Sequence, residues 1–305
     1  MSVILTLTQT AMELGLICAL CVLALFLSYS MLNVCDLSTD GCFTLGAVVG
    51  ASVAISGHPF LAIPASMFAG MCSGLVTAFL QTKIGIDSLL SGIIVNTGLY
   101  SINIAIMNGS SLLNMNKTTT IFTIFKEAFP FLSKYATLVI SLFFVAIVIL
   151  FLIIFLSTRL GLAIRATGDN HDMVKSSSIN PMFTTIIGLC IANMFTGLSG
   201  CLLAQSQKFV DINIGQGMVT VALASLLIGR TLISKGSIGK KALGVVLGSI
   251  IFRLVYTIAL RFNMPAFMLK LVSAIIVILA IGIPNIKKQW PIFIRKYKYN
   301  RGKTC

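Results

Sequence analysis

The sequence predicts an all-α, polytopic integral membrane protein. Of its 305 residues, 57% are hydrophobic and 10% are charged, and the mean hydropathy is +1.01. These values lie far outside the range of soluble domains. Residues 136–156 contain no charged side chain, and about 20 apolar residues in a helix match a hydrocarbon core of about 30 Å. Because segments of alternating hydrophobicity are absent, a helical bundle is favoured over a β-barrel.

Apolar windows of this kind predict about nine membrane spans. The first precedes every Lys and Arg of the chain, so it lacks the basic region of a cleavable signal peptide and is expected to remain. Gly57, His58, Pro59 and Pro64 interrupt the second and third spans, as in broken or re-entrant segments. The predicted spans are 11–33, 43–57, 59–81, 88–107, 135–157, 182–205, 218–234, 241–262 and 264–285.

Basic residues orient the predicted bundle. The chain has 22 Lys and Arg against 8 acidic residues, a formal net charge of +14. If the basic tail, residues 286–305, is cytoplasmic, alternation of the spans places most basic residues on that side and the N-terminus outside, as the positive-inside rule requires. We expect the tail to face anionic lipid rather than nucleic acid. Residues 1–285 then form one transmembrane domain.

Pairs of glycines four residues apart predict close contacts between helices. Small residues let helices approach each other where lipid removes the hydrophobic drive for packing. The pairs are Gly46 with Gly50, Gly70 with Gly74, and Gly244 with Gly248.

The sequence gives no support for an enzyme. No carboxylate pair, His–Cys cluster or Ser-centred elbow occurs at a useful spacing within a span. The eight cysteines are better explained as small buried hydrophobes than as metal ligands or disulfides, so no metal site is expected. The string from Gly236 to Lys241 has the wrong spacing for a Walker A motif and ends in Lys where Ser or Thr must hold magnesium. We therefore expect no cofactor in this chain, and any ATP and magnesium on a partner.

Polar side chains inside the predicted spans mark a candidate pathway. Such groups are costly in lipid unless they face a partner or water, so they either line a polar path or hydrogen-bond the helices together. Spacings of four and three place those of the span 88–107 on one helical face. The candidates are Asn96, Thr97, Tyr100 and Asn103 in that span, Asn193 and Thr196 in the span 182–205, and Arg253, which lacks an obvious acidic partner in the sequence.

Residues 159–181 form a long polar insert between two predicted spans. Gly168 offers a break, and Asp169 or Asn170 offers a cap for a short helix that runs through Ser178 and ends before Pro181. Such a helix is too short to be stable alone in water, so we expect it to dock on a partner protein rather than to be an ordinary loop. The candidate contact residues are Arg165, Gly168, Asp169, Asn170, Met173, Ile179 and Asn180.

Three strings resemble the permeases of one transporter superfamily. LGLAIRATGDN, residues 160–170, with Ile179 and Asn180 behind it, is similar to the cytoplasmic coupling segment of branched-chain amino acid and ribose ABC importer permeases. Residues 82–109 and 198–230 resemble the permease subunit of tryptophan/tyrosine-type importers. Ser178 and the pair Ile86-Asp87 depart from the family pattern, which often has Gly and a proline-containing linker at these places.

The resemblance implies the ABC importer permease fold and a multi-pass location in the bacterial cell membrane. It implies three partners: a second permease copy, a cytoplasmic ABC ATPase dimer on residues 159–181, and an extracytoplasmic substrate-binding lipoprotein. Asp211, Asn213 and Gln216, on the outer side, are then expected to gate the outer mouth or to contact the binding protein. The mechanism would be alternating access, and the solute an amino acid, with aromatic ones favoured.

The alternative is a secondary, ion-coupled transporter. Such a protein would need an ion or proton site near the membrane midplane, for which the predicted spans offer no carboxylate at depth.

Overall fold

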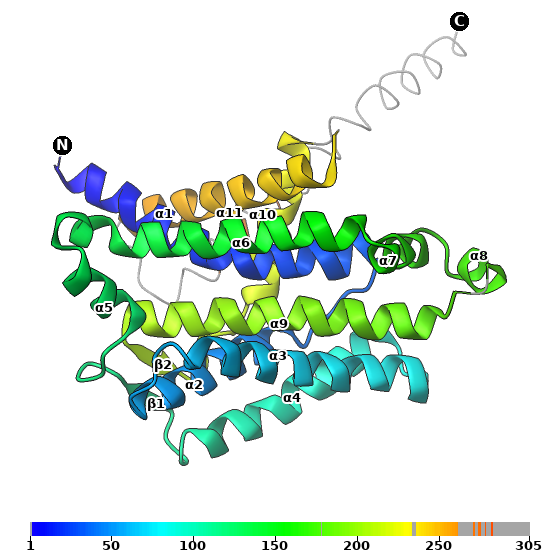
Figure 1. Ribbon diagram of the computed structural model, residues 1–305, viewed down its shortest axis with the longest axis horizontal. Coiled ribbons are helices and arrows are strands. Elements are labelled where there is room, and N and C mark those ends of the chain that lie inside the picture. Colours follow the sequence, from blue (N-terminus) through cyan, green and yellow to red (C-terminus); the bar gives the residue numbers. More distant parts are fainter. Residues whose placement is uncertain are drawn as a thin grey trace, which may run out of the picture.

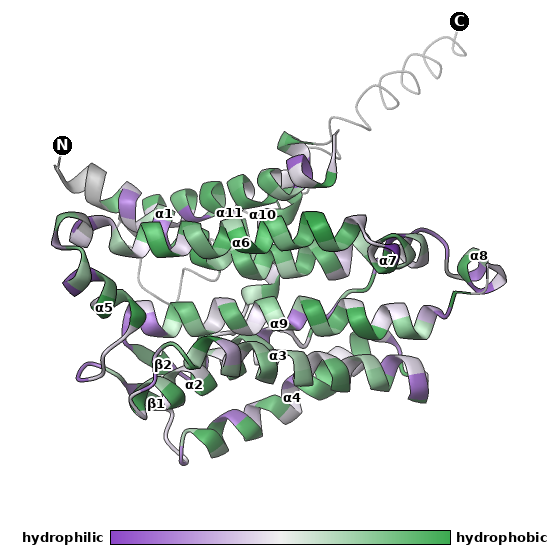
Figure 2. Ribbon diagram, viewed as in Figure 1, coloured by the Kyte–Doolittle hydropathy of each residue, from purple (hydrophilic) through white to green (hydrophobic). Residues whose placement is uncertain are grey.

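The computed structural model describes residues 2–177, 179–233 and 236–261, together with residues 271, 274, 275, 278 and 282. It is a bundle of long helices that lie side by side along one direction (Figure 1). Their sides are predominantly hydrophobic, whereas polar segments gather toward the two ends (Figure 2). A short helix, α8 (His171–Ser176), projects from one end, and a two-stranded sheet lies at the other. We call these the α8 end and the sheet end.

Helices account for nearly all of the described elements. The long ones are α1 (Ser2–Leu25), continued by the π-helical segment η1 (Phe26–Met31), α3 (Ala62–Phe79) with η2 (Leu80–Ile84), α4 (Ser88–Ile106), α6 (Ala136–Ser157), α9 (Pro181–Gln207) and α11 (Ile238–Arg261). The shorter ones are α2 (Thr39–Ile55), α10 (Met218–Leu232), α5 (Ile121–Ala128), η3 (Pro130–Tyr135) and α7 (Arg159–Asp169). Strands β1 (Leu112–Asn114) and β2 (Phe209–Asp211) pair antiparallel, a small addition to the predicted all-α class.

Six of the described helices are long and apolar enough to cross a membrane. They coincide with six of the predicted spans. The predicted spans 43–57 and 218–234 correspond to α2 and α10, whose 17 and 15 residues fall short of the roughly 20 residues that a span requires. Both begin inside the bundle, after the irregular segments 32–38 and 212–217. The count of about nine spans is therefore not confirmed, and the span 264–285, except for the isolated residues named above, and the tail 286–305 lie outside the described residues.

Helix α9 forms the centre of the bundle and packs against α1, α2 and α3. The packing is close because glycines face backbone atoms. A Cβ added to Gly46 would overlap the carbonyl oxygen of Gly197, and one added to Gly70 would overlap the carbonyl oxygen of Asn193. At Gly248 an added Cβ would overlap the carbonyl oxygen of Ser225. The contacts predicted from the glycine pairs are confirmed.

Replacing Gly46 with Ala should destabilise the bundle. The new methyl group has to push α2 away from α9, and such overpacking costs about 1–3 kcal/mol. We expect a lower melting temperature of the purified protein in detergent. Gly98→Ala is the matched control, because Gly98 is also helical and no atom lies within 4 Å of its Cβ position. An equal melting temperature of the two variants would contradict the packing that we describe.

Candidate functional site

A cavity of about 270 Å³ lies between the first turns of α2, the middle of α4 and the segment 212–217. It is slightly smaller than most small-molecule pockets, which have about 300–1,000 Å³. Polar side chains dominate the lining, and Asp40 is its one charged member among the described residues. The lining residues are Asp40, Gly41, Thr44, Asn96, Thr97, Tyr100, Asn103, Ile212 and Gln216.

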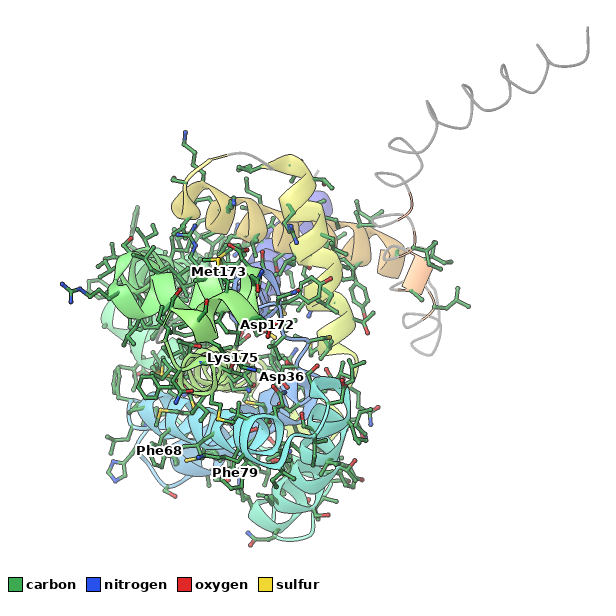
Figure 3. All side chains as sticks on the ribbon, turned by 90° about the vertical axis from the view of Figure 1, so that its right-hand side faces the viewer. Asp36, Phe68, Phe79, Asp172, Met173 and Lys175 are labelled. Atoms are coloured by element: carbon green, nitrogen blue, oxygen red, sulfur yellow. The ribbon has the colours of Figure 1, made fainter. Side chains whose placement is uncertain are left out.

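The cavity exists because α2 begins within the bundle. The segment 32–38 leaves η1 and carries Asp36, which is 2% exposed, into the interior (Figure 3). One carboxylate oxygen of Asp36 accepts hydrogen bonds from the backbone N–H and the hydroxyl of Ser38, at 2.8 and 2.6 Å. The other accepts from Nδ2 of Asn193 at 2.7 Å. A buried carboxylate is tolerated only with such partners, so this network fixes where α2 starts.

Asp40 connects α2 to the start of α10. Its Oδ2 accepts a hydrogen bond from the N–H of Gly217 at 2.9 Å, and its Oδ1 accepts one from the N–H of Val219 at 2.8 Å. The N-cap residue of α10 is Gly217, which has no side chain to cap the helix and adopts a φ of 84°. Asp40 supplies the missing cap, and its negative charge suits the positive end of the helix dipole. Two interrupted helices thus begin beside the cavity.

Gly41 brings α4 against the same turn of α2. A Cβ added to Gly41 would lie 2.6 Å from Oδ1 of Asn96 and 3.1 Å from the side chain of Leu99, so a larger residue would displace α4. Asn103 donates a hydrogen bond from Nδ2 to the carbonyl oxygen of Gly41 at 3.3 Å. Oδ1 of Asn103 is buried and has no hydrogen-bond partner among the described residues.

Thr97 and Tyr100 form the exposed rim of the cavity. Both lie on the outward side of α4, and the side chain of Tyr100 is 49% exposed. The Thr97 hydroxyl donates to the carbonyl oxygen of Ile93 at 2.9 Å, one helical turn earlier. The cavity thus collects the four predicted pathway residues of the span 88–107, together with Gln216 from the predicted outer gate.

Asn193 and Thr196 lie elsewhere. Both are buried on α9, where Asn193 binds Asp36 and the Thr196 hydroxyl donates to the carbonyl oxygen of Ala192 at 3.2 Å. Helix α2 packs on both α4 and α9, and α3 lies between α4 and α9 in Figure 1. The two groups of predicted pathway residues are therefore separated by other helices, and a pathway role for Asn193 and Thr196 remains a prediction.

Arg253 is also remote from the cavity. It lies on α11, which packs on α1. Its Nη2 donates to the Cys18 sulfur at 3.0 Å, and the guanidinium lies 5.5 Å from the centre of the Tyr256 ring. A pathway role for Arg253 remains a prediction.

The polar residues after β2 lead from the sheet end to the cavity. Asp211, the last residue of β2, accepts a hydrogen bond on Oδ1 from the N–H of Asn213 at 2.6 Å. Gln216 donates from Nε2 to Oδ1 of Asn213, also at 2.6 Å. Because Gln216 lines the cavity, this turn joins the predicted outer gate to the predicted pathway. The gating role itself remains a prediction.

Sequence reasoning missed the contribution of α2. It placed a span from residue 43 onward, so that Asp40 and Gly41 fell outside, and it found no carboxylate at depth. That expectation is wrong, since Asp36 is buried inside the bundle and Asp40 lines the cavity. The string from Asp36 to Gly41 is a run of mainly polar residues before an apolar stretch, the usual signal of a helix start. No comparable sequence signal indicates that Thr44 and Ile212 line the cavity.

At the α8 end, the cap of the projecting helix is Asn170. Its Oδ1 accepts hydrogen bonds from the N–H groups of Asp172 and Met173, at 3.1 and 3.0 Å. Asp169 is instead the last residue of α7, which continues through Gly168 without a break. Of the two predicted caps Asn170 is confirmed and Asp169 is wrong, because the chain turns one residue later than a break at Gly168 would allow.

Helix α7 is anchored to the bundle by several side chains, whereas α8 has one buried side chain, Val174, among its described residues and is otherwise exposed. Ile164 is 1% exposed, and the hydroxyls of Thr167 and Thr184 share a hydrogen bond of 2.9 Å. A Cβ on Gly168 would overlap the carbonyl oxygen of Met31. Met173 on α8, in contrast, is 59% exposed and lies toward the viewer in Figure 3, which looks onto this end.

The remaining predicted contact residues connect this region to α9. Asn180 is the N-cap of α9 and accepts from the N–H of Met182 at 3.0 Å. The backbone N–H of Ile179 donates to the carbonyl oxygen of Val174 at 3.3 Å, and Arg165 is half-buried on α7. These residues thus hold α8 between two anchored helices. Their contact with a partner remains a prediction.

A second cavity, of about 530 Å³, lies at the α8 end. It is bounded by the segment that leaves η1, by the ends of η2 and α7, and by the start of α9. Its lining includes Leu32, Val34, Gln81, Asp169 and Thr185.

Asn170→Ala should loosen α8. The substitution removes the acceptor for two backbone N–H groups, and loss of an N-cap costs about 1 kcal/mol of helix stability. We expect faster amide hydrogen exchange in residues 171–177. Asp169→Ala is the control and should leave that exchange unchanged. Equal effects of the two variants would show that Asn170 does not act as the cap.

Comparison with known proteins gives the relatives of this chain. A family model described as "Branched-chain amino acid transport system / permease component" matches residues 7–281. The tyrosine transport system permease protein of Clostridioides difficile is 34% identical over 278 residues, which cover 91% of each chain. An uncharacterised protein of Rickettsia prowazekii is 30% identical over 286 residues, 92% of this chain and 98% of that protein.

A more distant relative is the ribose import permease protein of Escherichia coli, 23% identical over 256 residues, 83% of this chain and 78% of that one. No solved structure matches the chain. The resemblance noted in the sequence is confirmed, and it agrees with the bundle of apolar helices. The chain is a member of the branched-chain amino acid transport system permease family.

Proposed function

We propose that this chain is the membrane-embedded permease subunit of an ABC importer and that the cavity on α2 and α4 is part of its route for an amino acid. The observation that carries the proposal is the polar cavity between two interrupted helices, which a bundle without a solute path would have no reason to keep. The amino acid follows from similarity to a tyrosine transport system permease protein.

The two cavities support alternating access. Leu32 and Val34 line the cavity at the α8 end, whereas Asp40 and Thr44, a few residues later, line the other. The buried Asp36 network lies on the chain between them. We infer that this segment is the barrier between the two compartments. Its rearrangement would close one cavity and open the other.

The ATPase partner would bind at the α8 end. A projecting, capped helix with an exposed Met173 suits insertion into a groove of another protein. Lys83 lies near the end of η2, Arg159 at the start of α7 and Lys240 in the first turn of α11. These segments lie at this end of the bundle (Figure 1). By the positive-inside rule this end is cytoplasmic and the N-terminus is outside. ATP and magnesium would be held by the ATPase, and a binding protein would meet the sheet end.

A second copy of the chain would cover α4. Thr97 and Tyr100 present polar groups on an outward face of a membrane-spanning helix, where direct contact with lipid is costly. A homodimer that joins two such faces would turn each open cavity into half of a closed pathway.

Uptake into vesicles that contain the complete transporter tests the proposal. We expect accumulation of radiolabelled L-tyrosine to require ATP and to be insensitive to the collapse of sodium and proton gradients. Accumulation that follows an imposed sodium or proton gradient without ATP would favour the secondary transporter instead. In that alternative, Asp36 and Asp40, buried and half-buried in the bundle, would be the candidate ion or proton sites.

A further inference from the structure

We propose that the cavity on α2 and α4 recognises the ammonium group of its solute, with Asp40 as the residue that selects it. This inference rests on the proposed function, because it takes the cavity to be the solute route. It adds a chemical class, a primary ammonium compound, and a residue that distinguishes such compounds from neutral or anionic ones.

The first step is charge. Asp40 is the one charged side chain among the described residues that line the cavity. Each of its carboxylate oxygens accepts one backbone N–H, and a carboxylate has about four lone-pair positions. Acceptor capacity therefore remains on this carboxylate, which lines the cavity. Neither Lys nor Arg occurs among these lining residues, so the local field attracts a cation.

The second step is the direction of the hydrogen bonds. The hydroxyl proton of Thr44 is donated to the carbonyl oxygen of Asp40 at 3.1 Å, and that of Thr97 to the carbonyl oxygen of Ile93 at 2.9 Å. Because both hydroxyl protons are already donated, these hydroxyl oxygens can only accept further hydrogen bonds. A ligand that donates hydrogen bonds fits these groups better than one that accepts them.

The third step is an unpaired acceptor. The carbonyl oxygen of Gly41 can only accept, so the nitrogen of the Asn103 amide must face it, as observed at 3.3 Å. That leaves Oδ1 of Asn103, on a side chain that is 1% exposed, without a partner among the described residues. A buried unpaired acceptor is costly, and a ligand donor would relieve that cost once α2 and α4 separate enough to expose it.

An ammonium group meets all three conditions, since it is cationic and has three donors and no acceptor. The Tyr100 ring at the rim offers an aromatic face to the remainder of the solute or to the cation itself. A free carboxylate would be repelled by Asp40, and the donors that the lining offers it are neutral groups such as the Asn96 amide and the Tyr100 hydroxyl. The cavity therefore favours the amino end of an amino acid over its carboxylate end.

Ligand-observed saturation-transfer NMR on the purified protein in lipid nanodiscs tests the inference. The probes are phenethylamine, which carries an ammonium group, 3-phenylpropanoate, which carries a carboxylate, and D-ribose, which carries neither group. We expect transfer to phenethylamine alone. Asp40→Asn should weaken its binding by about tenfold or more, the effect of losing one charge-assisted hydrogen bond. Asp87→Asn is the matched control, because Asp87 also caps a helix, α4, and is exposed outside the cavity.

Asp40→Asn also weakens the cap of α10, so a second variant leaves that cap intact. Thr97→Lys adds a cation at the rim and should reverse the preference, so that 3-phenylpropanoate binds and phenethylamine does not. Equal transfer to all probes, or binding that ignores both variants, would overturn ammonium recognition. Those results would not contradict the proposed solute route. That route would be contradicted by a different result, namely that substitutions in the cavity do not affect ATP-dependent uptake.

Discussion

Met173→Glu should abolish ATP-dependent uptake while the bundle stays folded. Met173 is 59% exposed on α8, and an apolar side chain in this position is expected to enter a groove of the ATPase. A carboxylate there would have to be buried without a partner, which costs several kcal/mol. The measurement is L-tyrosine uptake and ATP hydrolysis by vesicles that contain the complete transporter, with the melting temperature of the purified permease as the check on folding.

The control for this variant is Met182→Glu, at the start of α9. Met182 is also exposed at the α8 end but lies on an anchored helix rather than on α8. We expect it to retain most of the coupling. Normal uptake by Met173→Glu would refute the assignment of α8 as the coupling helix.

Asn96→Leu should lower uptake by about tenfold or more without a change in stability. Asn96 lines the cavity and is half-buried beside Gly41, and Leu is compatible with a membrane helix. The loss would come from the missing polar contact between Asn96 and the solute. A tenfold loss corresponds to about 1.4 kcal/mol of binding free energy. Initial uptake rates and melting temperatures measure the two effects separately.

Asn103→Leu provides the contrast. It removes the hydrogen bond from α4 to the carbonyl oxygen of Gly41 on α2, so it should lower both uptake and stability, the latter by about 1 kcal/mol. Unchanged uptake in Asn96→Leu together with a lowered melting temperature would show instead that the polar face of α4 only holds the helices together.

The sequence predicted the parts of the fold that depend on local pattern. The uncharged run 136–156 became α6, and the spacing of Asn96, Tyr100 and Asn103 placed them on one face of α4, where a single cavity now joins them. The polar insert became two helices with a cap at Asn170. In each case a helical period or a capping residue within a few positions carries the information.

The parts that were missed depend on contacts between distant residues. The interior start of α2 is fixed by Asp36 and Asn193, which are 157 positions apart, and that of α10 by Asp40 and Gly217, which are 177 positions apart. A hydropathy window cannot distinguish a helix that begins inside a bundle from one that crosses it. For the same reason the sequence does not show that the Asn193 amide donates to Asp36.

Thiol accessibility at Thr97 tests most directly the claim that the cavity on α2 and α4 is the solute route. In a cysteine-free background, Thr97→Cys should react with a small, membrane-impermeant methanethiosulfonate, lose uptake on modification, and be protected by excess L-tyrosine. Leu150→Cys, on the exposed apolar side of α6, should remain unmodified. A Thr97→Cys protein that resists the reagent, or that is modified without loss of uptake, would contradict the account.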